Sequence, residues 1–159
     1  MVRPSPLVPM EAVIFVGIQA SGKSTFFKQR FFNTHVRINL DMLRTRTREA
    51  ILLRACLEAK QRFVVDNTNP TPGDRARYIA PALAEGFRVV CYYFDSDVPG
   101  ALKRNALRSG SARIPAVGIY GTRKKLEPPS SEEGFEQIYT VRLAPEGGFA
   151  VQQLFPETE

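Results

Sequence analysis

Four residues near the N-terminus have the types and spacing of a loop that binds phosphate groups. Gly17, Gly22, Lys23 and Ser24 fit the pattern G-x-x-x-x-G-K-S. In this pattern the glycines let backbone N–H groups point at phosphate oxygens, the lysine reaches the β- and γ-phosphates, and the serine hydroxyl contacts Mg²⁺. The pattern therefore predicts that a nucleoside triphosphate and Mg²⁺ bind through Gly17, Gln19, Ala20, Ser21, Gly22, Lys23, Ser24 and, less strongly, Thr25.

A carboxylate follows the next apolar run along the chain. Asp41 comes just after residues 36–38, where it can approach the γ-phosphate and accept a proton from an attacking hydroxyl. Aspartate is also a good N-cap for a following helix, and the spacing leaves both interpretations open. Arg44 and Thr45 stand three and four residues further on. In one continuous helix they would share the face of Asp41.

Apolar patterns of two periods surround these residues and predict the elements that position them. Residues 12–16 are continuously apolar, as in a parallel strand that is buried on both faces. Further strands are expected at 36–38, 63–65, 87–94, 137–142 and, at the edge, 149–154. Helices are expected at 23–31, 41–61, 72–84, 98–108 and 115–126. This alternation predicts an α/β fold, a parallel sheet sandwiched by helices, and the glycine-rich loop makes it a P-loop NTPase-type sheet.

The expected sheet brings distant residues to one edge. Ligands of such sheets bind beyond the carboxyl ends of the strands, where Gly17, residues 39–41 and Asp66 would converge. The glycine-rich loop also has the required context, a buried strand before it and a helix after it. A chance glycine-rich turn is therefore the weaker interpretation of the pattern.

Composition and charge set the broad class. The chain has 159 residues, 43% of them hydrophobic and 24% charged, which predicts one domain over residues 11–159 after a flexible leader at residues 1–10. No apolar run is long enough for a bilayer, so a cytoplasmic or nuclear location is expected. The net charge of +6 attracts phosphorylated small molecules and nucleic acids alike. Cys56 and Cys91 lack metal-ligand or redox spacing and are expected to be reduced.

Four blocks of sequence resemble the kinase domain of the polynucleotide 5′-kinases, including the kinase half of the polynucleotide kinase phosphatases. They are the loop at 17–25, the segment 39–44, the stretch 64–70 with 75–78, and the distal block 104–135. The first is common to many nucleotide-binding proteins, whereas Asp-Asn-Thr-Asn-Pro at 66–70 with Arg-Ala-Arg-Tyr at 75–78 is more specific. The resemblance covers most of the chain and implies that the α/β fold carries a short helical lid. It implies an ATP-dependent kinase whose acceptor is the 5′-hydroxyl end of a nucleic acid.

The resemblance also implies roles on the acceptor side. Asp41 resembles the general base for the 5′-hydroxyl, and Arg44 resembles the residue that holds the first phosphate of the acceptor. Asp66 resembles the carboxylate at the end of the third strand, near the metal and the acceptor, and its expected contact to Mg²⁺ runs through water. Asn67 and Arg75 are further expected contacts to the substrate. From the residues alone, Asp66 could instead begin the turn that follows it, which is the weaker interpretation.

On the ATP side the resemblance points to two arginines of the distal block. Arg104 and Arg108 resemble lid arginines that close on ATP, and Arg108 is expected to stabilise charge on the transferring phosphate. With Lys23 and Asp41 it completes the expected catalytic set. The two arginines stand four residues apart and could instead form a solvated helix face. The sequence departs from the family at Leu40, where many members have arginine, so the resemblance leaves open how the acceptor is held at this position.

Two other functions fit the same loop. The first is a kinase of a small metabolite, nucleoside or antibiotic, because the same loop, aspartate and lid serve such acceptors. The second is an ATPase module that is not a kinase and whose acceptor is water. The basic composition and the distal block favour the polynucleotide kinase over both.

Overall fold

The computed structural model describes residues 10–154. Residues 1–9 of the expected leader lie outside the described residues. The described residues form one six-stranded sheet with the strand order β2-β3-β1-β4-β5-β6. Its first five strands are parallel, and β6 pairs antiparallel with β5 at one edge. The strands are β1 (Glu11–Val16), β2 (Val36–Ile38), β3 (Phe63–Val65), β4 (Arg88–Phe94), β5 (Gln137–Leu143) and β6 (Phe149–Gln153).

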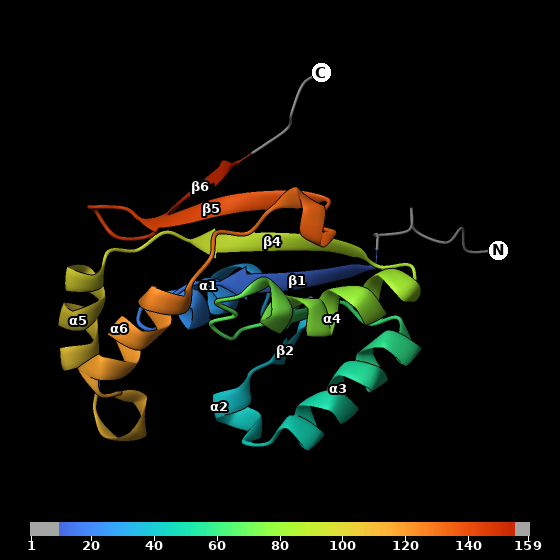
Figure 1. Ribbon diagram of the computed structural model, residues 1–159, viewed down its shortest axis with the longest axis horizontal. Coiled ribbons are helices and arrows are strands. Elements are labelled where there is room, and N and C mark those ends of the chain that lie inside the picture. Colours follow the sequence, from blue (N-terminus) through green and yellow to red (C-terminus); the bar gives the residue numbers. More distant parts are fainter. Residues whose placement is uncertain (1–9, 155–159) are drawn as a thin grey trace.

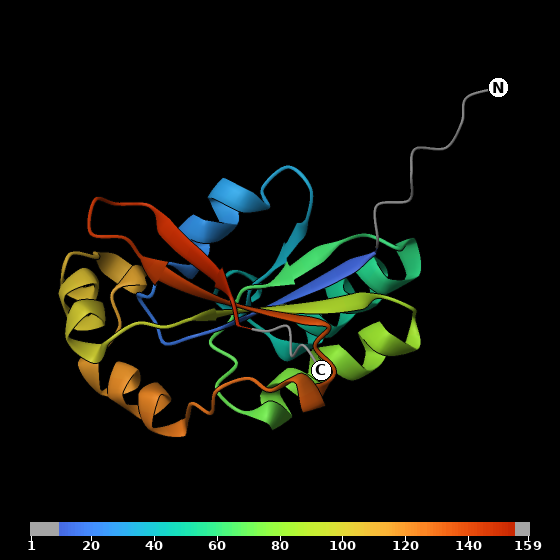
Figure 2. The same ribbon diagram turned by 90° about the horizontal axis from the view of Figure 1, so that it is seen from above.

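Helices cover both faces of the sheet, with α1 on one side and α3 and α4 on the other (Figure 2). They are α1 (Lys23–Arg30), α2 (Leu40–Leu43), α3 (Arg46–Ala59), α4 (Pro72–Ala84), α5 (Val98–Ala106) and α6 (Ala116–Lys125). Short 3₁₀ turns span Gly110–Ala112 and Ser131–Glu133. The α/β sandwich that the sequence predicts is confirmed.

The central strand β1 divides the core between these two faces. Ile14 and Val16 pack into the apolar cluster beneath α3 and α4, whereas Val13 and Phe15 pack into the aromatic cluster beneath α1. All four side chains are fully buried. The continuous apolar run of β1 therefore follows from its place at the centre of a parallel sheet covered on both faces.

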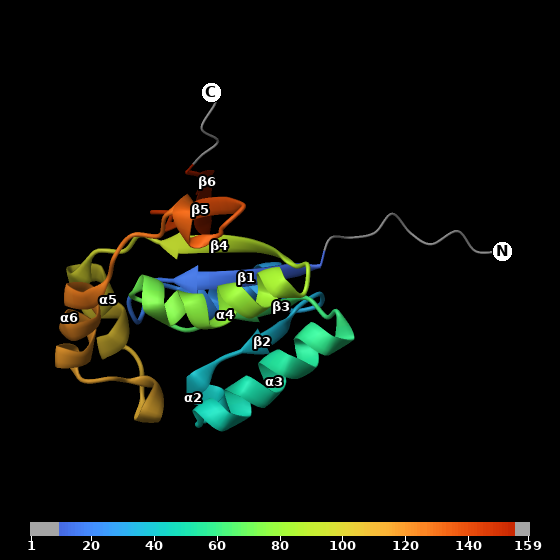
Figure 3. The ribbon, with the colours of Figure 1, turned by 45° about the vertical axis from the view of Figure 1, so that its right-hand side comes forward.

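Beyond the carboxyl ends of β1 and β4 stand α5 and α6, which form the lid (Figure 1). Figure 3 shows that α2 lies on the same side, so the lid and α2 flank the end of the sheet. Ile18 and Ala20 of the glycine-rich loop share a small buried cluster with Ala101 and Ile119 of the lid. Apolar contacts within this cluster hold the lid against the loop.

The long helix expected at 41–61 is wrong, because the structure has two helices there. Asn39 caps α2 by accepting a hydrogen bond from the backbone N–H of Met42. Arg44 then takes a positive φ (76°), which is incompatible with a continuing α-helix, and ends α2. Thr45 caps α3 by accepting from the N–H of Arg48. The expected shared face of Asp41, Arg44 and Thr45 is therefore wrong as well.

Candidate active site

The glycine-rich loop wraps from β1 into α1 through two left-handed residues. Its first glycine donates a backbone hydrogen bond to Thr68 O (3.0 Å), which ties the loop to the segment after β3. Gly17 also has no room for a side chain, since a Cβ there would lie 2.8 Å from that of Phe94. Ala20 (φ 58°) and Gly22 (φ 96°) turn the chain so that Gly22 becomes the N-cap of α1. The N-terminus of α1 thus opens toward the edge of the sheet, where an anion is favoured.

Lys23 fills the hollow of this loop. Its ammonium donates hydrogen bonds to Gly17 O (3.0 Å), Ile18 O (2.6 Å) and Ser21 Oγ (3.3 Å). Burial lowers the pKa of Lys23 to about 8, against the opposing effect of the Asp66 carboxylate. A charged lysine is thus held where only a few carbonyl oxygens replace water, and a phosphate anion there would favour the charged form.

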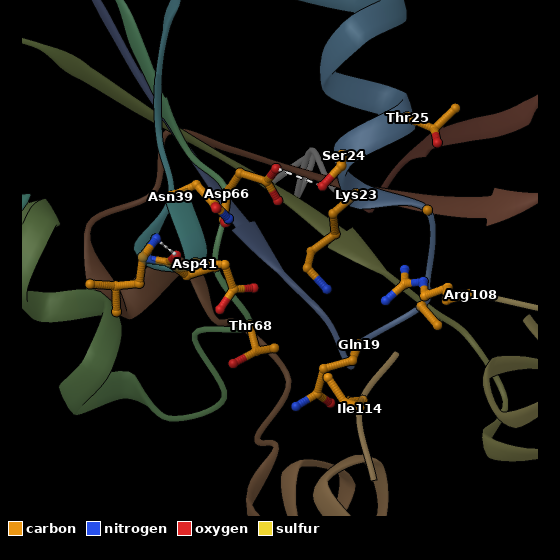
Figure 4. Close-up of a pocket in the computed structure, with 14 residues that line it drawn as sticks. Gln19, Lys23, Ser24, Thr25, Asn39, Asp41, Asp66, Thr68, Arg108 and Ile114 are labelled. Atoms are coloured by element: carbon orange, nitrogen blue, oxygen red, sulfur yellow. Dashed lines mark hydrogen bonds between the residues drawn. The ribbon is translucent and has the colours of Figure 1, made fainter. Parts of the chain in front are cut away.

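A cleft of about 310 Å³ opens beside Lys23, and its walls come from four parts of the chain. The glycine-rich loop and α1 form one wall, and the segments after β2 and β3 form the wall opposite. The lid contributes the remainder (Figure 4). The lining residues are Gln19, Ala20, Gly22, Lys23, Ser24, Thr25, Asn39, Leu40, Asp41, Asp66, Asn67, Thr68, Arg108 and Ile114. Residues 39–41 and Asp66 therefore line one cleft together with the glycine-rich loop, as expected at the carboxyl ends of parallel strands.

Ser24 and Asp66 present two oxygens side by side. Ser24 Oγ donates to Asp66 Oδ2 (3.1 Å) although the two residues lie on α1 and after β3. A hydroxyl and a carboxylate are ligands that Mg²⁺ accepts, directly or through water, so this pair fits the ion expected with the nucleotide. Arg37 donates to the same carboxylate oxygen (2.9 Å) and to Ser24 Oγ (3.0 Å). Its positive charge balances Asp66, whose side chain is 2% exposed.

Within residues 10–154, no group of three or more His, Cys, Asp or Glu side chains is arranged to hold a metal ion. An ion at Ser24 and Asp66 would therefore take its other ligands from the nucleotide and from water. This is the usual way in which Mg²⁺ binds beside a phosphate loop.

Asp41 points into the cleft from α2, and Figure 4 shows its carboxylate facing the Lys23 ammonium. Its side chain is free of capping duty, because Asn39 is the residue that caps α2. This removes the N-cap interpretation that the sequence leaves open. Asp41 is also exposed, so an acceptor can reach it from solvent.

The two lid arginines have different surroundings. Arg108 lines the cleft, and its guanidinium donates only to Ala112 O (3.3 Å) among the described residues. Arg104 instead donates to Ala20 O on the back of the glycine-rich loop and to Ser96 Oγ (2.7 Å). Arg104 therefore braces the loop from outside the cleft, while Arg108 reaches into it.

Comparison with known protein families finds one family model that matches most of the chain. A family model described as an AAA domain matches residues 13–129, which include the glycine-rich loop, both sides of the cleft and the lid. The chain belongs to this AAA domain family. No helix within the described part of the AAA domain is long and apolar enough to cross a membrane.

Curated relatives of the AAA domain carry names of polynucleotide-modifying enzymes. A bifunctional polynucleotide phosphatase/kinase of Schizosaccharomyces pombe is 28% identical over 138 residues, which cover 82% of this chain and 33% of the relative. A putative bifunctional polynucleotide phosphatase/kinase of Acanthamoeba polyphaga mimivirus is 29% identical over 140 residues, with the same coverage of 82% and 33%. The chain thus spans about a third of the length of these relatives. The resemblance seen in the four sequence blocks is confirmed.

Solved structures agree on the fold. Kti12 of Chaetomium thermophilum, in complex with ADP-AlF3, superposes with a TM-score of 0.62 and 14% identity. The match covers 82% of this chain and 88% of that one. At this identity the likeness supports the fold of the AAA domain alone.

One expected substrate contact of the AAA domain is wrong. Arg75 is fully buried and lies outside the cleft lining. Its guanidinium pairs with both carboxylate oxygens of Glu133 (2.7 and 3.1 Å) and donates to the backbone carbonyls of Asn69 and Glu127. Arg75 therefore fastens α4 to the segment before β5, with four of its five N–H donors engaged and the side chain closed off from a substrate.

The other predicted residues divide between the cleft and its supports. Thr25 and Gln19 line the cleft, and Gln19 also donates to Thr122 of α6 (2.9 Å). Asn67 lines it as well, but its amide is engaged in hydrogen bonds behind the cleft wall. Ser21 is buried within the loop, where its hydroxyl accepts from Lys23. Arg44 is exposed at the end of α2, outside the cleft lining.

Sequence reasoning assigned no role to several residues of the site: Arg37, Thr68, Ile114 and Asn39, the last of which it placed at this edge of the sheet without a function. Thr68 stands inside a block that the sequence does single out, yet no role is assigned to it. Arg37 lies inside a strand, where alternating residues normally face either a helix layer or solvent. The signal that could have found Asn39 is its position just before α2, where asparagine is a preferred cap.

Proposed function

We propose that this AAA domain is a polynucleotide 5′-kinase, which transfers the γ-phosphate of ATP to the hydroxyl at the 5′ end of a DNA or RNA strand. The observation that carries the proposal is the carboxylate of Asp41 facing Lys23 across a cleft that opens to solvent. A phosphate loop alone is shared by kinases, ATPases and GTPases. A free carboxylate opposite the loop is what distinguishes a site built for a hydroxyl acceptor.

In this mechanism Lys23 and the loop N–H groups bind the β- and γ-phosphates. Ser24 and Asp66 would hold Mg²⁺, which supplies positive charge to those phosphates when it is bound. The 5′-oxygen forms a bond to the γ-phosphorus, the bond from that phosphorus to the bridging oxygen of ADP breaks, and Asp41 accepts the hydroxyl proton. Arg108 balances charge on the transferring group.

The nature of the acceptor rests on two further supports. The curated relatives that match over most of this chain are named polynucleotide phosphatase/kinases. The wall that bears Asp41 also carries exposed arginines at 44 and 48, and a nucleic acid strand offers a phosphate next to its terminal nucleoside. Arg44 is the residue that we assign to that phosphate, with binding energy there helping to orient the hydroxyl.

The experiment measures transfer of labelled γ-phosphate to a panel of acceptors. A 5′-hydroxyl oligonucleotide should be used with far higher kcat/KM than the matching nucleoside, and a 5′-phosphorylated oligonucleotide should accept nothing. Asp41→Asn should keep the affinity for ATP and lower kcat by about 10²- to 10⁴-fold, because the amide cannot accept the proton. Arg44→Ala should impair the oligonucleotide and the 3′-nucleotide but spare the nucleoside.

Equal efficiency on nucleoside and oligonucleotide would instead identify a small-molecule kinase. Steady ATP hydrolysis that no hydroxyl acceptor stimulates would identify an ATPase. A loss in Asp41→Asn that lies entirely in ATP affinity would remove Asp41 from the role of base.

A further inference from the structure

A buried polar network lies behind the cleft wall that bears Asp41. Its centre is Glu49 of α3, which is 2% exposed. One carboxylate oxygen, Oε1, accepts from Arg46 (2.8 Å). The other, Oε2, accepts from the hydroxyl of Tyr78 (3.0 Å) and from the amide nitrogen of Asn67 (3.1 Å). Tyr78 of α4 is fully buried, so the network is closed to solvent on that side.

This carboxylate determines which way the amide of Asn67 faces. An asparagine side chain has one donor end and one acceptor end. The carboxylate of Glu49 can only accept, so it holds the Nδ2 end of Asn67 toward itself and leaves Oδ1 on the opposite side. The same nitrogen also donates to the hydroxyl of Tyr78 (3.2 Å), which can accept there because its own proton goes to Glu49. That oxygen accepts a hydrogen bond from the backbone N–H of Leu40 (2.9 Å).

The N–H of Leu40 belongs to the first turn of α2, whose next residue is Asp41. First-turn N–H groups have no partner inside their own helix. Asn39 caps the N–H of Met42, and Asn67 caps the N–H of Leu40. Because α2 spans only Leu40–Leu43, these two caps largely fix its orientation and with it the direction of Asp41.

Stability alone does not account for a carboxylate at this position. A buried ion pair is often no more stabilising than apolar residues of similar volume, since both charges must lose water. Arg46 is also half-exposed, with 53% of its side chain accessible, which weakens its attraction to Glu49. The feature that an apolar residue could not reproduce is the acceptor that Glu49 offers to Asn67.

We propose that Glu49 is a positioning residue for phosphoryl transfer: it orients the amide of Asn67, which holds the N–H of Leu40 and so aims Asp41 at the acceptor hydroxyl. The inference rests on the proposed function of Asp41 as the base. Glu49 itself touches neither ATP nor acceptor, because it is buried behind the wall.

The first variant pair tests the polarity of the Glu49–Asn67 contact. Asn67→Asp places a second carboxylate against Glu49, and kcat should fall on the order of 10- to 100-fold, the loss expected from a small misplacement of a reacting group. Adding Glu49→Gln restores the hydrogen bond with its direction reversed. The amide introduced at position 49 donates to the carboxylate introduced at position 67. The double variant should therefore recover to within about 3-fold of wild type, as expected when coupled residues are changed together.

Single variants at Glu49 distinguish its role as a hydrogen-bond acceptor from the role of its negative charge. Glu49→Gln keeps an acceptor for Asn67 and should lose little activity. Glu49→Leu fills the space without an acceptor, so it should lower kcat as Asn67→Asp does while KM for ATP stays unchanged. Glu58→Gln, an exposed glutamate on the same helix, is the matched control and should behave as wild type. In an Asp41→Asn background, Glu49→Leu should have no further effect on kcat.

A readout that needs no catalysis keeps this inference separable from the proposed function. Amide hydrogen exchange at Leu40 should be slow in wild type and in the exchanged double variant, and faster in Glu49→Leu and Asn67→Asp. Protected exchange with no transfer to any acceptor would refute the kinase while keeping the geometry. Unchanged kcat in folded Glu49→Leu, or an unrescued double variant with normal stability, would overturn the positioning role.

Discussion

At the scale of single residues, the surroundings of Lys23 suit an ammonium that has a phosphate beside it better than one without. Its side chain is enclosed by backbone carbonyls, and burial lowers its pKa to about 8. Phosphate oxygens would supply the negative charge that the carbonyls provide only in part. Nucleotide binding and protonation of Lys23 are therefore linked.

We expect ATP binding to take up a proton above pH 8. In the free protein Lys23 is increasingly neutral above its pKa of about 8, whereas the bound phosphates favour the charged amine. Uptake should thus appear between pH 8 and the ordinary lysine pKa near 10.5 and vanish at pH 7, where Lys23 is already charged. Calorimetric titration with ATP in buffers of different ionisation enthalpy measures it. Lys23→Ala should remain folded, show no uptake and transfer no phosphate; identical uptake in that variant would assign the proton elsewhere.

Substitutions of the two lid arginines should affect different kinetic constants. Arg108 lines the cleft, so Arg108→Ala should lower kcat by about 10²- to 10³-fold, the usual cost of losing one donor to developing charge. Its affinities for ATP and oligonucleotide should change much less. Arg104→Ala removes a brace from the glycine-rich loop, so its main effect should be a raised KM for ATP. Weakened oligonucleotide binding with an unchanged kcat in Arg108→Ala would move Arg108 to the acceptor groove.

The sequence predicts best those site residues whose neighbours are local. The glycine-rich loop is read from eight consecutive residues, and its conformation depends mainly on its own glycines and the helix that follows. Arg75 is the opposite case. Its partner Glu133 is 58 positions away, so nothing in its own segment distinguishes a buried clamp from a surface arginine. Arg37 likewise meets Ser24 and Asp66 only after three separate elements have packed.

At the scale of elements, the strands are predicted well and one helix is not. Apolar runs such as 12–16 set their own boundaries, because a strand buried on both faces tolerates few polar residues. The helical pattern of 41–61 continues through Arg44 and Thr45, and periodicity alone gives no sign of the break. Two competing caps decide it: Asn39 begins α2, and the hydroxyl of Thr45 begins α3. Because of the break, α2 is a single short turn whose direction depends on its caps. Asp41 belongs to that turn.

The contact between α4 and the segment before β5 should carry a large share of stability. Arg75→Gln leaves Glu133 without its partner and should lower the free energy of unfolding by about 3 to 5 kcal/mol, as expected for a broken buried pair. Arg77→Gln, at an exposed position of the same helix, should change it by less than about 0.5 kcal/mol. Urea denaturation of both variants makes the comparison. A normal unfolding midpoint for Arg75→Gln, together with weaker oligonucleotide use, would return Arg75 to the substrate site.

At the scale of the whole molecule, the chain is basic, with a net charge of +6. Exposed basic residues stand at the end of α2, in the first turn of α3 and at the end of α6: Arg44, Arg48, Arg123, Lys124 and Lys125. A nucleic acid strand that contacts such groups displaces counterions as it binds.

Oligonucleotide affinity should therefore fall as salt rises, whereas nucleoside affinity should not. Each neutralised phosphate of a single strand contributes about 0.7 to the slope of log affinity against log salt. Contact with three phosphates would give a slope of about −2. Titrations from low to high NaCl at constant pH measure it. Arg44→Ala should make the slope shallower by the contribution of one phosphate, and a flat slope in wild type would contradict a polyanionic acceptor.

The glycine-rich loop is supported by the edge strand β6, which is synthesised long after the loop itself. Phe149, at the start of β6, lies against Gly22, where an added Cβ would meet its ring at 2.9 Å, and it packs edge-on against Phe26 of α1. The loop is made early on the ribosome, but its outer support arrives only when the chain has been extended past residue 149. A nascent chain that already contains the complete phosphate-binding motif would still lack this support. Tight nucleotide binding during translation should therefore begin abruptly, once β6 has left the exit tunnel and paired with β5.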